Sequence, residues 1–208
     1  MLPCMEIETP HGAARAHVHE VADPRGLLVL GHGAGGGVGA PDLATARDAA
    51  SAAGWSVALV EQPYRVAGRR SPAPATQLDA AWIAVCDRLR PPGVPLVTGG
   101  RSSGARVACR TAAATGAAGV LCLAFPLVSP SGASRQDELD AVEAPVLVVQ
   151  GTTDRFGMPE PGPNREVVRV AGDHGLKKDQ PAIGAAVGAW LQSVWSSASK
   201  RSPRTRQS

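Results

Sequence analysis

The sequence predicts an α/β protein in which one mostly parallel sheet of seven or eight strands carries helices on both faces. Short apolar runs alternate with segments of helical periodicity, which is typical of βα units. The 208 residues suffice for one core and contain no internal repeat. Hydrophobic residues make up 44% and charged residues 19%, so a wholly disordered chain is excluded. We expect a single domain over residues 1–195.

The first strands differ in pattern from those that follow. Residues 5–9 and 13–20 predict two strands joined by a turn at 10–12. Within the second, small or apolar residues alternate with Arg15, His17 and His19, which is typical of a half-exposed antiparallel edge strand. Residues 27–30 form a continuous apolar run instead. That run predicts a central strand covered on both faces.

The rest of the chain continues the alternation of strands and helices. A polar, proline-bearing loop is expected over 61–75, and only about 20 residues separate Phe125 from Pro145, which leaves no room for a cap domain. The further expected strands cover 55–60, 95–98, 119–125, 145–150 and 165–170, and the expected helices cover 41–53, 76–89, 106–114, 135–142 and 179–195.

The net charge of +3 comes from the C-terminal tail. Residues 200–208 carry four basic side chains and no acid, so the remainder is close to neutral. We expect 196–208 to be a basic disordered tail, and we expect no nucleic-acid partner because no basic patch on a folded face is indicated. No apolar run is long enough to span a membrane, and no signal peptide is recognised, so we expect a cytoplasmic protein without a membrane partner.

The four cysteines show no pattern typical of metal or disulfide sites. Cys4, Cys86, Cys109 and Cys122 lie far apart in sequence without a CxxC pair, so we interpret them as buried thiols. His17 and His19 share one face of a strand, but no third ligand is near them in sequence. We therefore expect no metal and no cofactor.

The strongest local motif is Gly100-Arg101-Ser102-Ser103-Gly104, a G-x-S-x-G pentapeptide between an expected strand and an expected helix. Such a turn holds its serine in a strained conformation and lifts the hydroxyl above the sheet edge. A Cβ at either glycine would collide with the neighbouring strand and helix. The sequence therefore predicts Ser102 as a nucleophile. Ser103 is the rival, but it has Arg101 where its first glycine should be.

A serine nucleophile needs a base and an acid that orients the base. His174 follows the last expected strand and is the only histidine after the serine. Asp154 follows the strand at 145–150, and this order of serine, acid and histidine is typical of such sheets. Asp140 and Asp173 remain weaker candidates for the acid.

Two backbone N–H groups are expected to stabilise the oxyanion. One belongs to Ser103, the residue after the nucleophile. The other is assigned to Ala34, in the glycine-rich loop at 32–37 that follows the first central strand. His32 is expected to orient this loop rather than to react. The same loop lacks the spacing of a dinucleotide or P-loop site.

These residues resemble the α/β-hydrolase superfamily, in particular its small cap-less branch near the dienelactone hydrolases. The likeness is closer still to the α/β-hydrolase-like domain of testis-expressed protein thirty and of subunit three of the NSL chromatin complex. This resemblance also implies Ser102, Asp154 and His174 as the triad. The segments that carry it are 31–36, 63–65, 68–72, 99–102, 125–127, 149–157 and 172–174.

The resulting hypothesis is a serine hydrolase that cleaves a small ester, thioester or lactone, with a small-molecule acyl substrate as its partner. The alternative is a non-catalytic module that uses the same fold to bind a protein, because some relatives serve as complex subunits. Several arginines in the expected loops would favour an anionic substrate, unless acids such as Glu61 and Asp48 pair with them. These arginines are Arg65, Arg69, Arg70, Arg101 and Arg155.

Overall fold

The computed structural model describes residues 4–201 and contains one eight-stranded sheet in the order β1-β2-β4-β3-β5-β6-β7-β8. β1 and β2 are antiparallel to their neighbours, whereas every pair from β4 to β8 is parallel. The predicted α/β class and mostly parallel sheet are confirmed. The strands are β1 (Cys4–Ile7), β2 (Ala14–His19), β3 (Gly26–Gly31), β4 (Trp55–Glu61), β5 (Leu96–Arg101), β6 (Gly119–Leu123), β7 (Val146–Gly151) and β8 (Arg165–Val170).

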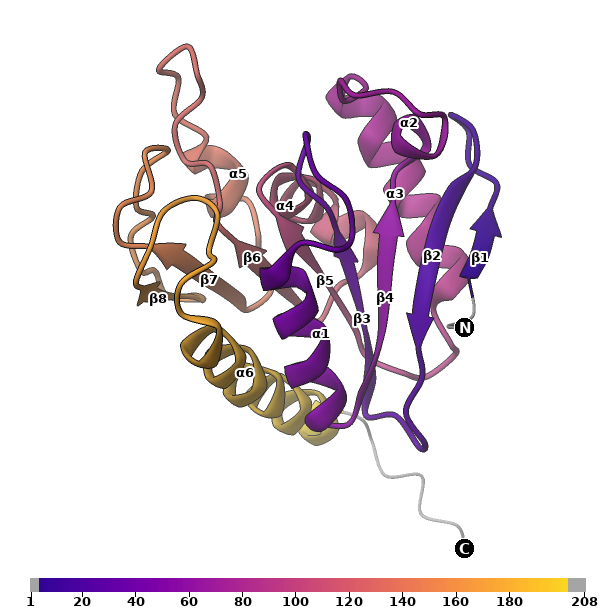
Figure 1. Cartoon of the computed structure of the whole chain (residues 1–208). Helices are drawn as coiled ribbons and strands as arrows, with labels where there is room; N and C mark the ends of the chain where they lie inside the picture. The colour runs from indigo at the N-terminus through magenta and orange to yellow at the C-terminus, as the bar shows by residue number, and fades with distance from the viewer. Residues whose placement is uncertain (1–3, 202–208) are drawn as a thin grey trace, which may run out of the picture.

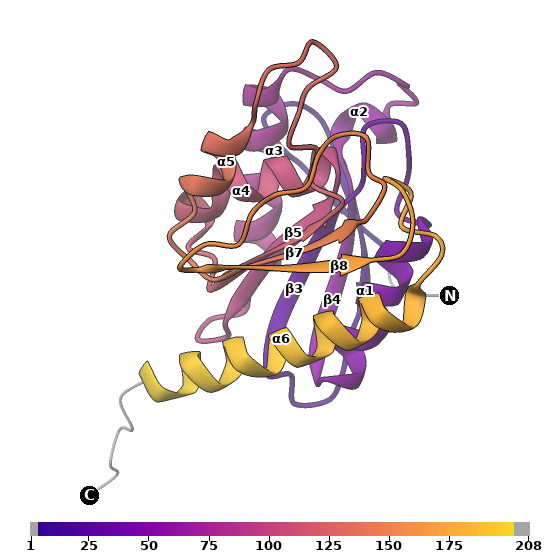
Figure 2. The ribbon, with the colours of Figure 1, turned by 90° about the vertical axis from the view of Figure 1, so that its left-hand side faces the viewer.

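Helices cover both faces of this sheet (Figure 1). α1 and α6 pack together on one face, while α3, α4 and α5 lie on the other; Figure 2 shows the sheet between the two layers. Between β6 and β7 the chain forms only the short α5, so no cap covers the sheet edge there. The helices are α1 (Pro41–Ala52), α2 (Pro63–Val66), α3 (Ala75–Leu89), α4 (Ser103–Thr115), α5 (Gln136–Asp140) and α6 (Gln180–Arg201).

The apolar run of β3 is explained by the two helical layers. Leu28 and Leu30 join the core cluster under α1 and α6, whereas Leu27 and Val29 join the cluster under α3. All four side chains are buried. A central parallel strand therefore needs apolar residues at consecutive positions, as predicted.

Four expectations about individual elements were wrong. β2 is not an edge strand, because β1 pairs with one side of it and β4 with the other. The expected loop at 61–75 contains α2, which begins with Pro63 in its first turn. α4 begins at Ser103 rather than at 106, because the turn at Ser102 leads directly into the helix. α6 continues to Arg201, so residues 196–201 belong to this helix rather than to a tail, and 202–208 lie outside the described residues.

The cysteines also differ from their expected placement. Cys4 is exposed, whereas Cys86, Cys109 and Cys122 are buried. Burial raises the pKa of the Cys86 thiol to about 12. The sulfur atoms of Cys109 and Cys122, from α4 and β6, lie 3.5 Å apart although the two residues are distant in sequence. Within residues 4–201, no helix combines the length and the apolar character that a membrane span requires.

Candidate active site

Ser102 lies at the sharp turn between β5 and α4. Its backbone has φ 52° and ψ −107°, a left-handed conformation that is strained for a residue with a side chain. The Ser102 N–H donates a hydrogen bond to Leu123 O at 2.9 Å, which ties the turn to β6. A Cβ at Gly100 or at Gly104 would lie 2.4 Å from Gly31 O, so both glycines are required by close approach to β3, as the motif predicts.

The three side chains selected from the sequence come together above the carboxyl ends of the strands. His174 Nε2 lies 3.0 Å from Ser102 Oγ, and His174 Nδ1 lies 2.8 Å from Asp154 Oδ2. When Asp154 is ionised, Nδ1 carries the proton and donates to it. The Nε2 lone pair then accepts a hydrogen bond from the serine hydroxyl, which is the arrangement that a general base requires.

The side chain of Asp154 is completely buried and is oriented from two further sides. The Phe156 N–H donates to Asp154 Oδ1 at 2.9 Å, and Gln150 Nε2 donates to Asp154 Oδ2 at 2.9 Å. Gln150 is itself buried in β7, and its amide nitrogen also lies within hydrogen-bond distance of Phe125 O and Gly157 O. Sequence reasoning missed Gln150. The available signal was a lone amide at the end of the apolar run at 146–149.

The His174 ring is also held by a packing contact. Phe156 lies edge-on to it with 4.6 Å between ring centroids. The Arg155 guanidinium stacks 4.8 Å from the centroid of the Phe156 ring. Phe156 thus packs against the imidazole, and Arg155 packs against Phe156.

The glycine-rich loop after β3 lies directly beside the nucleophile. A Cβ at Gly33 would lie 3.6 Å from Ser102 Cβ. His32 is buried. Its Nδ1 donates to Gly33 O at 2.8 Å, and its Nε2 accepts the Gln62 N–H at 3.2 Å, so the contacts fit a neutral imidazole with one protonated nitrogen. Burial lowers the pKa of His32, which favours this neutral form. His32 therefore orients the loop, as expected.

Both backbone groups assigned to the oxyanion hole lie next to this contact. Ala34 follows Gly33, and its carbonyl accepts a hydrogen bond from Tyr64 Oη at 3.0 Å. Ser103 is the first residue of α4, where an N–H has no acceptor within the helix. The two N–H groups thus belong to the loop after β3, which passes close to Ser102, and to the start of the helix that follows Ser102.

Arg101 forms an ion pair, but with neither of the two acids that the sequence suggested. Arg101 pairs with the buried Asp42 rather than with Asp48 or Glu61. Asp48 pairs with its neighbour Arg47. Glu61 contacts Arg15 and His17 instead, which also gives His17 a carboxylate partner. Among residues 4–201, no group of three potential ligands is arranged to hold a metal ion.

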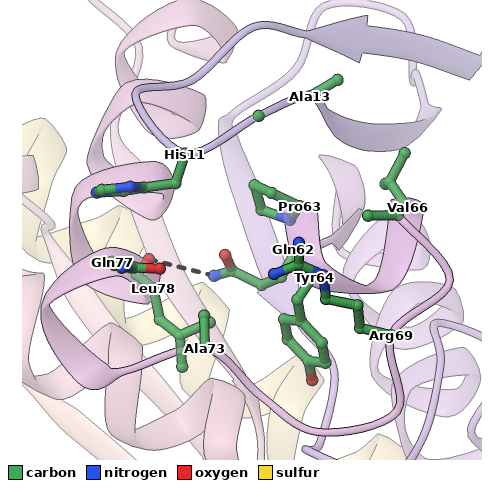
Figure 3. A pocket seen from close by; sticks show the side chains of 12 residues that line it. His11, Ala13, Gln62, Pro63, Tyr64, Val66, Arg69, Ala73, Gln77 and Leu78 are labelled. Atoms are coloured by element: carbon green, nitrogen blue, oxygen red, sulfur yellow. Dashed lines mark hydrogen bonds between the residues drawn. The ribbon is translucent and has the colours of Figure 1, made fainter.

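Two cavities lie near the triad or near the residues that support the loop after β3. One of about 370 Å³ opens beside the base and is lined by His174, Phe156, Arg155 and Lys177 among others. Another of about 260 Å³ lies between the β1–β2 turn, α2 and the start of α3, with Gln62 and Tyr64 in its wall (Figure 3). The lining of this second cavity does not include Ser102, Asp154 or His174, and Tyr64 in its wall donates a hydrogen bond to Ala34 O in the loop after β3.

Comparison with known proteins agrees with the fold. A family model described as an alpha/beta hydrolase domain matches residues 24–197. The chain belongs to this family. No curated protein matches the sequence significantly. The matched range contains Ser102, Asp154 and His174 as well as the loop after β3.

Solved structures of this alpha/beta hydrolase fold cover nearly the whole chain. A lidless α/β serine hydrolase from Xanthomonas campestris is 21% identical, with a TM-score of 0.78 over 92% of this chain and 94% of that one. A dienelactone hydrolase from Anabaena variabilis is 15% identical, with a TM-score of 0.73 over 93% and 97%. A serine hydrolase homologue from Coxiella burnetii is 14% identical, with a TM-score of 0.73 over 91% and 97%. At these identities the likeness shows the fold.

Proposed function

We propose that the protein is a serine hydrolase that cleaves a small ester, thioester or lactone through an acyl-enzyme intermediate. The observation that carries this proposal is the continuous hydrogen-bonded chain from Ser102 through His174 to Asp154. Ser102 is held above the sheet by a strained turn, and the carboxylate of Asp154 is buried with both oxygens bonded. A fold that only bound a partner would not need a serine, a histidine and an aspartate aligned in one hydrogen-bonded chain.

In the acylation half-reaction, Ser102 Oγ attacks the carbonyl carbon while His174 Nε2 takes the hydroxyl proton. Asp154 stabilises the imidazolium that forms. The N–H groups of Ala34 and Ser103 stabilise the negative oxygen of the tetrahedral intermediate. When the intermediate collapses, the bond to the leaving group breaks, and His174 returns the proton to that leaving alcohol or thiol.

In the second half-reaction, His174 takes a proton from water, and the resulting nucleophile attacks the acyl group on Ser102. Collapse releases the carboxylic acid and returns the proton to Oγ. Groups of the protein and water carry out every nucleophilic attack and proton transfer of the two half-reactions, so we propose no cofactor and no metal. The open sheet edge and the cavity of about 370 Å³ beside His174 favour a small or extended acyl substrate over a long lipid.

The test is covalent labelling of the full-length protein with a fluorophosphonate probe, with Ser102→Ala as the control. We expect the probe to label the wild type at Ser102 alone. The wild type should also hydrolyse p-nitrophenyl acetate, and the rate should be at least about 10²-fold lower in Ser102→Ala. A second candidate is a non-catalytic interaction module, which the resemblance to the NSL-complex domain favours. A wild-type protein that is neither labelled nor hydrolytic would support that module instead.

A further inference from the structure

Arg101 is the last residue of β5 and immediately precedes the nucleophile. Its side chain is 19% exposed, and its polar atoms face neighbouring segments of the chain rather than water. Its guanidinium contacts two segments that are far apart in sequence, the loop carrying His174 and the first turn of α1, and it lies close beside a third, the glycine-rich loop after β3.

The contact with the base loop is a hydrogen bond to the main chain. Arg101 Nη2 donates to His174 O at 2.7 Å, and donors with a full positive charge make stronger bonds than neutral donors. The carbonyl belongs to the residue whose ring must reach both Ser102 and Asp154. Fixing that peptide group fixes the point from which the imidazole extends.

The contact with α1 is a buried ion pair. Arg101 Nε lies 2.9 Å from Oδ2 of Asp42, whose side chain is fully buried in the first turn of the helix. Asp42 Oδ1 accepts the Leu43 N–H, whereas Oδ2 has no well-aligned hydrogen bond. The attraction between Arg101 and Asp42 is therefore that of an ion pair rather than of a directional hydrogen bond. Removing one partner from a buried pair would leave the other charge uncompensated.

The third neighbour is the glycine-rich loop after β3. Arg101 Nη1 is 3.2 Å from the position that a Cβ on Gly33 would occupy, so the guanidinium lies close beside this loop and leaves little room for a larger residue there. The planar group is therefore bounded by the segment that carries the base, by the segment assigned to the oxyanion, and by the helix into which that segment leads.

We propose that Arg101 is a positioning residue that fixes the separation between the His174 loop and the loop at 32–34, with Asp42 as its anchor. This inference rests on the proposed function and assigns Arg101 no contact with substrate. Arginine suits the role because its rigid fork directs several N–H groups at once, whereas a lysine ammonium is a single point charge.

The experiment compares Arg101→Met and Arg101→Lys with the wild type, using kcat and KM for p-nitrophenyl acetate and the thermal unfolding midpoint. We expect kcat to fall about 10- to 100-fold in both variants, because a displacement of about 1 Å in a catalytic group can cost that much. KM should stay within about threefold, since no substrate contact is removed.

Arg110→Met is the matched control. Arg110 has similar exposure and pairs with Asp79 and Glu138, but its partners lie on α3 and α5, away from the triad. It should lower the unfolding midpoint and leave kcat unchanged. Wild-type kcat in Arg101→Lys, or a raised KM at constant kcat, would overturn the inference; if Arg101→Met does not fold, Arg101→Lys decides alone.

A wild-type protein without activity or labelling would count against the proposed function rather than against this positioning. The imidazole NMR signals of His174 then provide the test without turnover. They should shift in Arg101→Lys and stay in place in Arg110→Met. Unchanged His174 signals in Arg101→Lys would overturn the inference.

Discussion

The base side and the oxyanion side of the site are constructed in different ways. On the base side, the groups that are held in place are side chains: Gln150 and the Phe156 N–H orient the Asp154 carboxylate, and Asp154 orients the His174 ring. On the oxyanion side, side chains hold the main chain: His32 donates to Gly33 O, and Tyr64 donates to Ala34 O. The proposed reacting atoms are thus side-chain atoms on one side and backbone N–H groups on the other.

This difference predicts how the two sides respond to substitution. A change on the base side can remove or misalign a reacting atom. On the oxyanion side no substitution removes an N–H except one to proline, so a change there can only displace the donor. We therefore expect graded losses, largest at the acid and smallest at Ser103.

Asp154→Asn should have the largest effect among these substitutions. The asparagine amide would favour the wrong tautomer of His174, and the turnover rate of the best-studied triad falls by about 10⁴-fold for this reason. The measurement is kcat for p-nitrophenyl acetate at constant protein concentration. A fully active Asp154→Asn variant would transfer the acid role to Asp140 or Asp173.

Tyr64→Phe tests the oxyanion side. It removes only the hydroxyl that bonds Ala34 O at 3.0 Å, and the ring remains buried. We expect kcat to fall about 10-fold with little change in KM, which is less than the loss of an oxyanion donor itself. The comparison between the two sides would fail if Tyr64→Phe cost as much activity as Asp154→Asn.

His32 connects the oxyanion side to the pH dependence of stability. Burial lowers its pKa in the folded state, so the unfolded chain binds this proton first as the pH falls below about 6.5. The free energy of unfolding should therefore be highest above that pH and fall with a slope of up to about 1.4 kcal/mol per pH unit from this group.

Urea unfolding at several pH values between about 5 and about 7.5 measures this slope. In His32→Gln the contribution should disappear, because glutamine does not titrate. His11→Gln, at an exposed histidine, serves as the control and should keep the wild-type slope. Equal slopes in the wild type and His32→Gln would contradict the prediction.

Ser103→Ala should have the smallest effect. Only the Ser103 N–H is assigned a role, and alanine retains it, so kcat should stay within about threefold of the wild type. The side chain begins α4, where alanine is well tolerated. If this variant were inactive while Ser102→Ala kept its activity, Ser103 would be the nucleophile.

Much of the site could be predicted because each of its principal residues follows a strand. The G-x-S-x-G turn, the acid after 145–150 and the histidine after 165–170 are each local patterns in the sequence. Parallel strands bring their carboxyl ends to one edge, so residues in three separate loops can meet there. The family match shows an alpha/beta hydrolase domain, and the closer resemblance to a domain of the NSL complex stays a prediction.

The sequence by itself determined the class of the fold and the order of nucleophile, acid and base. Only the tertiary structure decided which polar groups support them. Asp42 lies 59 residues before Arg101, and Cys109 and Cys122 belong to different elements, so no local pattern indicates that either pair is in contact. A local motif reports backbone geometry that nearby residues impose. A buried partner is selected by the packing of distant segments, because a charge or an amide removed from water must be satisfied wherever the fold places a complementary group.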